Sequence, residues 1–196
     1  MADHDLVAVW EKHLGSEFAE RNPDGPILTM VADAHLNHVP TMTGGTGVDE
    51  LKRFYKYHFV TVNPPDMQIV PVSRTVGANS IVDEMVVEFT HTCVIDYLLP
   101  GIAPTGRRVR IPAVVIVQFR DGKLASEHIY WDQASVLVQI GKLDPAGLPI
   151  AGVEIARKVL DHSLPSNELM AREWQSSEGR VTSGRPSPLD EPHSNQ

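Results

Sequence analysis

At 196 residues with 42% hydrophobic content, the chain is long enough for one domain with a sizeable core and short for two. Its net charge of −8 argues against a nucleic-acid backbone or an anionic membrane surface as the main partner, because both require clustered lysine and arginine. A single cysteine excludes a scaffold of intramolecular disulfides, and no window approaches the roughly 18 apolar residues that span a bilayer. We therefore expect a soluble, cytoplasmic protein.

Helices are predicted in the first third of the chain. Apolar residues recur every four positions from Leu6 to Phe18, which indicates an amphipathic helix. A second helix is expected to begin at Asp24 or Pro26, since aspartate caps well and proline suits a first turn. It should end near Pro40, because proline disfavours helical geometry at the residue before it.

A glycine-rich loop over 41–47 is expected to precede a third helix over 48–60. The buried side of this helix should carry Leu51, Phe54, Tyr55 and Phe59. His35 and His38 are spaced like metal ligands, but no third ligand follows at a recognisable spacing, so we predict no metal site.

Strands follow in the middle of the chain, where valine, isoleucine and aromatic residues are frequent. The predicted strands are residues 67–75, about 81–95, 109–120 and 124–131. Alternation places Met85, Val87, Phe89, His91 and Cys93 on one face of the second strand. Helices followed by neighbouring strands indicate an α+β domain with an antiparallel sheet covered by helices on one face.

The last part of the chain is predicted to be helical and then irregular. A short helix should follow Asp132 and end at a glycine cap, Gly141. Further helices are expected over about 152–161 and over 166–175, with Ser166 capping the second. Residues 176–196 hold almost no large apolar side chains and should form a flexible tail.

Asp132 allows two interpretations. It lies between the aromatic pair Tyr130 and Trp131 and a predicted helix, so it can serve as an ordinary helix cap. It can also sit in an apolar cavity between the sheet and the helices. Burial there would raise the pKa of its carboxyl group towards the working pH, which suits a general acid or base.

The segment FTHTCVIDYLLPGIAPTGRRVRIPAVVIVQFRDGKLASEHIYWDQASVLVQIG, residues 89–141, resembles the second half of the SnoaL-like polyketide cyclases of the nuclear transport factor 2-like superfamily. Those proteins have a THTG-like strand, a PPTGR-like turn, a DGKI hairpin, and a strand that ends in an acid before a helix containing QLG. The resemblance covers approximately residues 5–145. It implies an α+β cone in which a strongly curved antiparallel sheet wraps around N-terminal helices and leaves a pocket at one end.

The same resemblance implies a chemistry for the pocket. Asp132 would abstract a proton next to a carbonyl and start an intramolecular aldol closure, and His91 would line the pocket and assist. The superfamily also contains ketosteroid isomerases, in which an Asp base works beside an oxyanion hole. It contains dehydratases, epoxide hydrolases and members without catalysis as well.

Further residues are expected to contact the substrate. On a regular strand His128 and Tyr130 share the face of Asp132, whereas a bulge near YW would turn Trp131 inward instead. The predicted substrate-binding residues are Tyr130, His128, Trp131, His38 and Phe89.

We therefore predict an enzyme that acts without a cofactor on a small apolar carbonyl compound, as a cyclase or isomerase. The alternatives are a pocket that only binds an apolar molecule and a hydratase or dehydratase; an exposed or fully engaged Asp132 would favour the binding pocket. We expect a cone domain over 1–145, a helical extension over 146–175 and a tail over 176–196. By resemblance, two copies should pair through the outer face of the sheet as a homodimer.

Overall fold

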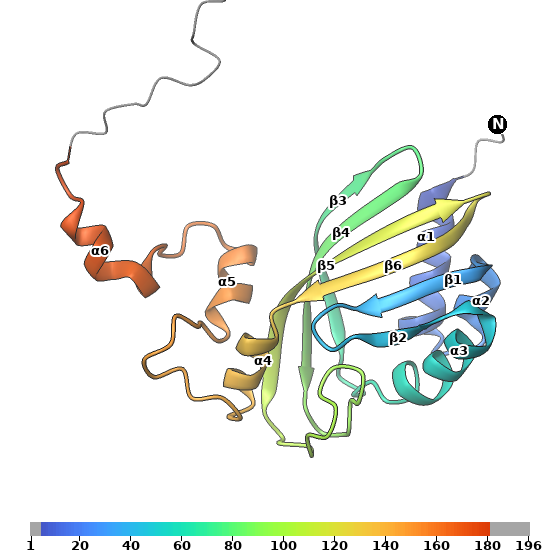
Figure 1. The fold of residues 1–196 in the computed structure, drawn as a ribbon, viewed down its shortest axis with the longest axis horizontal. Coiled ribbons are helices and arrows are strands. Elements are labelled where there is room, and N and C mark those ends of the chain that lie inside the picture. The colour runs from blue at the N-terminus through green and yellow to red at the C-terminus, as the bar shows by residue number, and fades with distance from the viewer. Residues whose placement is uncertain (1–4, 181–196) are drawn as a thin grey trace, which may run out of the picture. The chain divides into compact units, whose positions relative to one another are not determined.

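The computed structural model describes residues 5–180 and centres on a six-stranded mixed sheet with the strand order β2-β1-β6-β5-β4-β3 (Figure 1). The strands are β1 (Met30–His38), β2 (Thr43–Thr46), β3 (Gln68–Val76), β4 (Ser80–Thr90), β5 (Arg108–Arg120) and β6 (Lys123–Trp131). All neighbouring pairs are antiparallel except β1 with β6, which run parallel. The sheet and the helices that precede it make the predicted α+β fold.

Two helical segments of the N-terminal part continue as π-helical turns. The helices are α1 (Leu6–Leu14), α2 (Gly25–Thr29), α3 (Gly47–Phe54), α4 (Gln133–Gln139), α5 (Glu154–Leu160) and α6 (Ala171–Ser176). A π-helical turn over Gly15–Ala19 extends α1, and another over Tyr55–Phe59 extends α3. The predicted first and third helices are thereby confirmed. Between residues 5 and 180, the chain has no helix that combines the length and the apolar character of a membrane span.

The predicted second helix is wrong beyond Thr29. Pro26 does lie in the first turn of α2, but strand β1 begins directly after it, at Met30. Ala34, Leu36 and His38 of β1 are buried, and pairing with β2 and β6 satisfies the backbone. Sheet pairing of this kind overrides a weak helix propensity.

The expected loop over 41–47 is also partly wrong, because Thr43–Thr46 form the edge strand β2. Gly44 has a φ of +147°, and a Cβ there would lie 2.0 Å from the carbonyl oxygen of Leu36. Only glycine allows the two strands to approach this closely. The glycines of this segment therefore serve strand pairing.

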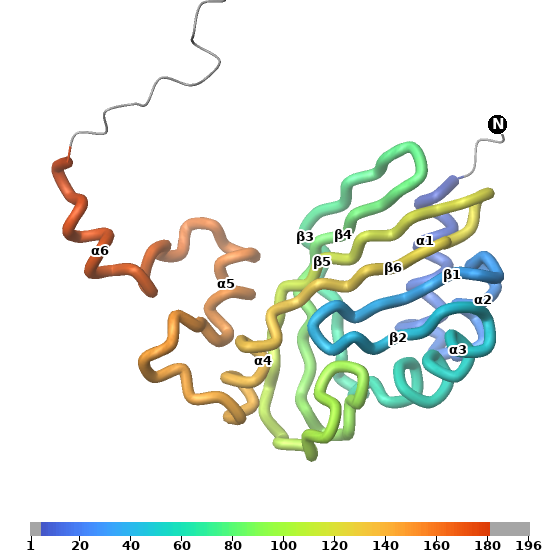
Figure 2. Tube along the Cα trace, in the orientation of Figure 1, coloured from blue at the N-terminus to red at the C-terminus, as the bar shows by residue number. Residues whose placement is uncertain are grey.

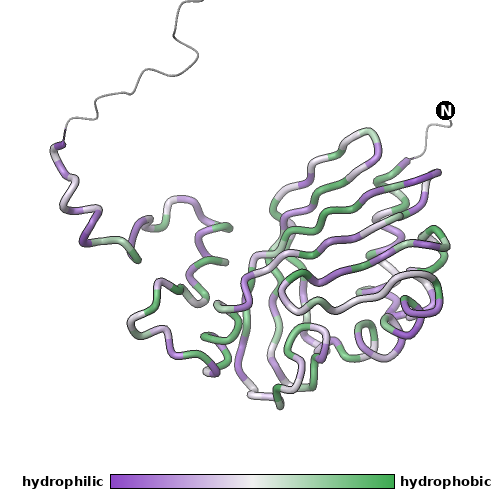
Figure 3. Tube along the Cα trace, viewed as in Figure 1, coloured by the Kyte–Doolittle hydropathy of each residue, from purple (hydrophilic) through white to green (hydrophobic). Residues whose placement is uncertain are grey.

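The predicted strand region and the segments after it agree closely with the structure. The four predicted strands correspond to β3 to β6, although β4 ends at Thr90, short of the predicted end near residue 95. Asp121 and Gly122 form the expected two-residue turn with φ of 53° and 72°. Helix α4 ends before Gly141, whose φ is +70°, and α5 lies within the expected range. Figure 3 shows the alternation of hydrophobic and hydrophilic residues along the strands.

Residues 165–180 belong to a second unit, whereas α5 belongs to the first unit and packs on β4 and β5. The expected helix over 166–175 corresponds to a 3-10 turn, Glu168–Met170, followed by α6. The predicted cap at Ser166 is wrong, because Asn167, with a left-handed φ of 68°, occupies the cap position. Residues 181–196 of the expected tail lie outside the described residues, and the division at residues 145 and 175 stays a prediction.

Helix α1 lies across one face of the sheet and contacts β4 and β6 (Figure 2). Asp83 of β4, which is 5% exposed, fixes it there: the Trp10 indole N–H donates to Asp83 Oδ2 at 2.7 Å. Arg74 of β3 donates to both oxygens of the same carboxylate, at 2.7 and 2.8 Å. One buried acid thus joins the helix to two strands.

Replacing Asp83 by alanine should lower the free energy of unfolding by about 3 kcal/mol, because it leaves a buried indole N–H and a guanidinium group without their partner. Urea denaturation measures the change. Glu84→Ala is the matched control, since Glu84 only accepts an exposed bond from Ser73 and should cost under about 0.5 kcal/mol. Equal losses in the two variants would contradict this role of Asp83.

Candidate active site

A mostly apolar cavity lies between the inner face of the sheet and the N-terminal helices. The centre of a water molecule can occupy about 80 Å³ of this cavity. The total space not filled by atoms, part of which is open to solvent, is about 710 Å³. This is enough to hold several waters or a small ligand. Met85, Val87 and Phe89 of β4 line it, which confirms the predicted apolar face of that strand for these three residues.

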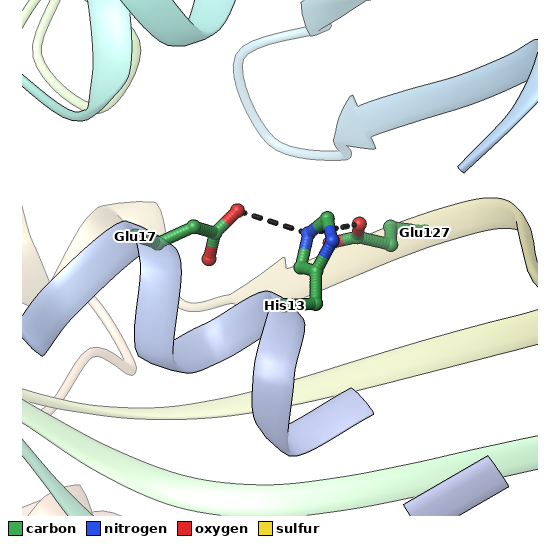
Figure 4. Close-up of side chains that lie close together, drawn as sticks. All are labelled: His13, Glu17 and Glu127. Carbon is green, nitrogen blue, oxygen red and sulfur yellow. Dashed lines mark ion pairs between the residues drawn. The ribbon is translucent and has the colours of Figure 1, made fainter. Parts of the chain in front are cut away.

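Two carboxyl groups, those of Glu17 and Glu127, interrupt the apolar wall. Glu17 lies in the π-helical turn that extends α1, and Glu127 points inward from β6. His13 Nε2 lies between them, 3.1 Å from Glu17 Oε1 and 3.0 Å from Glu127 Oε1 (Figure 4). All three side chains are at least 96% buried. They form a hydrogen-bonded ion-pair cluster, called here the His13 cluster.

The hydrogen bonds around His13 determine its protonation. The Thr29 hydroxyl donates to the Pro26 carbonyl, so its oxygen accepts a bond from His13 Nδ1 at 2.6 Å. Because Nε2 faces two carboxylic side chains, both ring nitrogens carry protons and the ring is an imidazolium. Burial alone would lower the pKa of His13, but Glu127 and Glu17 outweigh it and raise that pKa to about 10.

The two carboxyl groups have different surroundings. Burial raises the pKa of Glu17 above its usual value, against the opposing effect of His13. Glu127 Oε1 lies 3.0 Å from His13 Nε2 and 3.4 Å from the Tyr55 hydroxyl, which can donate to it. Burial also raises the pKa of Tyr55 well above 10, so this phenol stays protonated. The cluster thus places two carboxyl groups, one of them with a raised pKa, beside the same buried ring nitrogen.

The His13 cluster is also the one group of three potential metal ligands among residues 5–180, with ligand atoms within 4.8 Å of one another. A nitrogen and two carboxylates suit a divalent cation. Binding such a cation would require release of the Nε2 proton, and the raised pKa of His13 opposes this release.

The expected enclosed position of Asp132 is wrong. Asp132 is exposed, and its Oδ1 accepts the backbone N–H of Ser135 at 2.9 Å as the cap of α4. The inward residues of β6 are Glu127, Ile129 and Trp131, so the chain turns away from the cavity at the next position. Of the two interpretations of this acid, the structure supports the helix cap.

A β-bulge explains which residues of β6 face the cavity. Ser126 pairs with Gln118 and Leu124 pairs with Phe119, so Ala125 is an extra residue in the strand. Leu124 is fully buried, and regular alternation from it would turn His128 and Tyr130 inward. The extra residue shifts the alternation by one position, so Glu127, Ile129 and Trp131 face inward instead. The predicted contacts of His128 and Tyr130 with the cavity are wrong. Trp131 does face inward, as the alternative predicted, but the bulge lies at Ala125 and not near Tyr130 and Trp131.

His128 and Tyr130 occupy the opposite face of the sheet. His128 Nε2 lies 3.1 Å from Nε2 of His35 on β1, and the Tyr130 side chain is 43% exposed. His91 is buried just beyond β4, and its Nδ1 lies 3.2 Å from the Thr105 hydroxyl. Burial lowers the pKa of His91. The cavity wall, as far as residues 5–180 form it, includes Phe89 but not His91, so the predicted pocket position of His91 is wrong.

Three of the predicted substrate-binding residues do line the cavity: Phe89, His38 and Trp131. The sequence interpretation missed His13, Glu17 and Glu127. A signal for two of them was present, because His13 and Glu17 lie four residues apart on the apolar stripe of the first helix, where charged side chains are unusual.

The model of the SnoaL-like polyketide cyclases matches residues 16–140 of the chain. The chain belongs to this family. Among proteins with curated functions, none is significantly similar to it in sequence.

Solved structures show the same nuclear transport factor 2-like fold at low identity. TsrD from Streptomyces laurentii is 16% identical with a TM-score of 0.56, covering 73% of this chain and 100% of that one. An NTF2-like protein of unknown function from Burkholderia pseudomallei K96243 is 20% identical, with a TM-score of 0.53 and coverages of 69% and 96%. A protein with a ketosteroid isomerase-like fold from Catenulispora acidiphila DSM 44928, in complex with trimethylamine, is 14% identical, with a TM-score of 0.52 and coverages of 70% and 92%.

The buried imidazolium of this SnoaL-like chain should make its stability fall as the pH rises. The pKa of His13 is raised from 6.5 to about 10 in the folded protein, so its contribution is complete below about pH 6.5 and is lost as the pH approaches 10. Urea unfolding from pH 6 to pH 10 measures this loss, which should be smaller in His13→Gln.

If His13→Gln does not fold, the ring can be observed directly. The Cε1–H resonance of His13 in the parent protein should keep the chemical shift of an imidazolium at pH 8. A neutral imidazole at that pH would contradict the assignment.

Proposed function

We propose that the protein is an acid/base enzyme that enolises a small apolar carbonyl compound in this cavity, as a cyclase or isomerase. The observation that carries the proposal is the His13 cluster, in which two carboxyl groups border an apolar space around one buried imidazolium. Acid/base catalysis needs one group that gives a proton and one that takes a proton at the same site.

In the proposed reaction Glu127 takes a proton from the carbon next to the carbonyl, and Glu17 gives its proton to the carbonyl oxygen. The product of this step is a neutral enol. In a cyclase the enol carbon then attacks a second carbonyl of the same molecule. In an isomerase the enol takes a proton at another carbon, and in both cases Glu127 and Glu17 return to their starting states. His13 positions both groups and keeps its proton.

The family assignment supports this proposal, because the family is described as polyketide cyclases. The proposed reaction uses no cofactor or metal ion, and this stays a prediction. Activity should therefore persist after dialysis against a chelator. Its loss, and recovery with one divalent cation, would indicate that the His13 cluster acts as a metal site.

Exchange of α-protons of 1-indanone and 2-tetralone into deuterium oxide, followed by NMR, tests the proposal without knowledge of the natural substrate. Glu127→Gln should slow exchange about 100-fold or more, because it removes the base and keeps the shape of the side chain. Asp132→Asn, which keeps a capping side chain, should exchange within about twofold of the parent. The reverse pattern would restore the Asp132 assignment and refute that of Glu127.

A second candidate function is ligand binding without catalysis. It is favoured by the exposed position of Asp132, which removes the acid that the sequence motif offered. Binding of both ketones by the parent protein, without exchange faster than in buffer, would support it. The proposed hydratase or dehydratase chemistry and the homodimer through the outer face of the sheet stay predictions.

A further inference from the structure

Two side chains of the cavity wall hold buried polar atoms that lack hydrogen-bond partners among the described residues. They are Trp131, through its indole N–H, and His38, through both ring nitrogens. Trp131 is 9% exposed and His38 is 5% exposed. Because an unpaired buried polar group costs free energy, such groups at a cavity point to a ligand that completes them.

The unpaired state of Trp131 contrasts with that of Trp10, the other tryptophan of the cavity wall. The indole N–H of Trp10 is occupied by Asp83 at 2.7 Å, whereas that of Trp131 finds no acceptor within residues 5–180. An indole N–H can only donate. The missing partner of Trp131 is therefore an acceptor such as a carbonyl oxygen.

His38 needs a different hydrogen-bond partner from that of Trp131. Burial lowers its pKa to about 3, so the ring is neutral and offers one donor and one acceptor. Its ring packs against Phe54, Phe59 and Tyr97, with centroids 6.1, 5.9 and 4.8 Å away. These rings provide apolar contact and no charge. A hydroxyl group, which both donates and accepts, matches the ring, and a carbonyl satisfies its donor.

We propose that Trp131 and His38 determine specificity by binding two oxygen atoms of one otherwise apolar ligand, a carbonyl at Trp131 and a hydroxyl or second carbonyl at His38. Trp131 and Glu127 face the same side of β6 but lie four residues apart, about 13 Å along the strand. The contact at Trp131 therefore goes beyond the proposed function and does not require its carbonyl to be the one that is enolised. Hydroxyketones and diketones are the ligand class that fits.

The carbonyl contact is tested with indane and 1-indanone, which differ by one oxygen, in a binding titration by calorimetry. We expect Trp131→Phe to reduce the preference for 1-indanone over indane about five- to tenfold. Trp10→Phe is the matched control, because it removes a cavity tryptophan whose N–H is already occupied, and should leave the preference unchanged. An unchanged preference in Trp131→Phe overturns the carbonyl contact.

A spectroscopic readout separates contact from a merely structural role. In the parent protein the indole N–H resonance of Trp131 should move downfield with 1-indanone and remain in place with indane. Glu127→Gln should keep this shift and the ligand preference while losing proton exchange. Loss of exchange alone thus concerns the proposed function, whereas loss of the shift or of the preference concerns Trp131.

The second oxygen is tested with 3-hydroxy-1-indanone against 1-indanone. His38→Phe preserves the aromatic packing and should reduce the preference for the hydroxyketone about fivefold. Leu98→Met, which changes an apolar wall residue that is not assigned to the ligand, should leave that preference unchanged. If the parent protein does not prefer the hydroxyketone, or if His38→Phe prefers it equally, the two-oxygen proposal fails.

Discussion

One buried positive charge, on the His13 imidazolium, is the interaction on which the candidate site depends. Two carboxyl groups border the same apolar space, and without a cation both would favour their neutral forms there. The imidazolium opposes this effect of burial, which raises the pKa of Glu17. Two groups that can carry protons therefore lie within hydrogen-bond distance of one ring. The Thr29 hydroxyl holds this ring in place from the other side.

The fold assembles this charge arrangement from distant parts of the chain. His13 and Glu17 come from the first helical segment, whereas Glu127 comes from the last strand of the sheet. Each π-helical turn contributes one side chain near His13: Glu17 lies in the first turn and Tyr55 in the second. Such turns recur at functional sites because they shift side chains relative to a regular helix. The buried Asp83 holds α1 against the sheet. The same contact therefore stabilises the domain and positions His13 in the site.

Sequence patterns predicted the four long strands and both amphipathic helices, because their apolar periodicity is strong and local. They missed β1, whose conformation depends on pairing with β6, a strand about 90 residues later in the chain. They placed Asp132 in the cavity because it follows an aromatic pair and because of the family resemblance. In the structure Glu127 and Trp131 take the inner face of β6, and Asp132 caps α4. The motif around Asp132 thus identified the family and the fold. The residues that line the cavity could be identified only from the three-dimensional structure.

The bulge at Ala125 also bears on how such sheets diversify. A point substitution alters one side chain, whereas gain or loss of one residue in a strand exchanges every side chain between the two faces beyond it. In this chain that single step decides whether the sheet presents Glu127 and Trp131, or His128 and Tyr130, to its interior. A length change in one strand of this α+β fold can therefore exchange the side chains that face its cavity without any substitution.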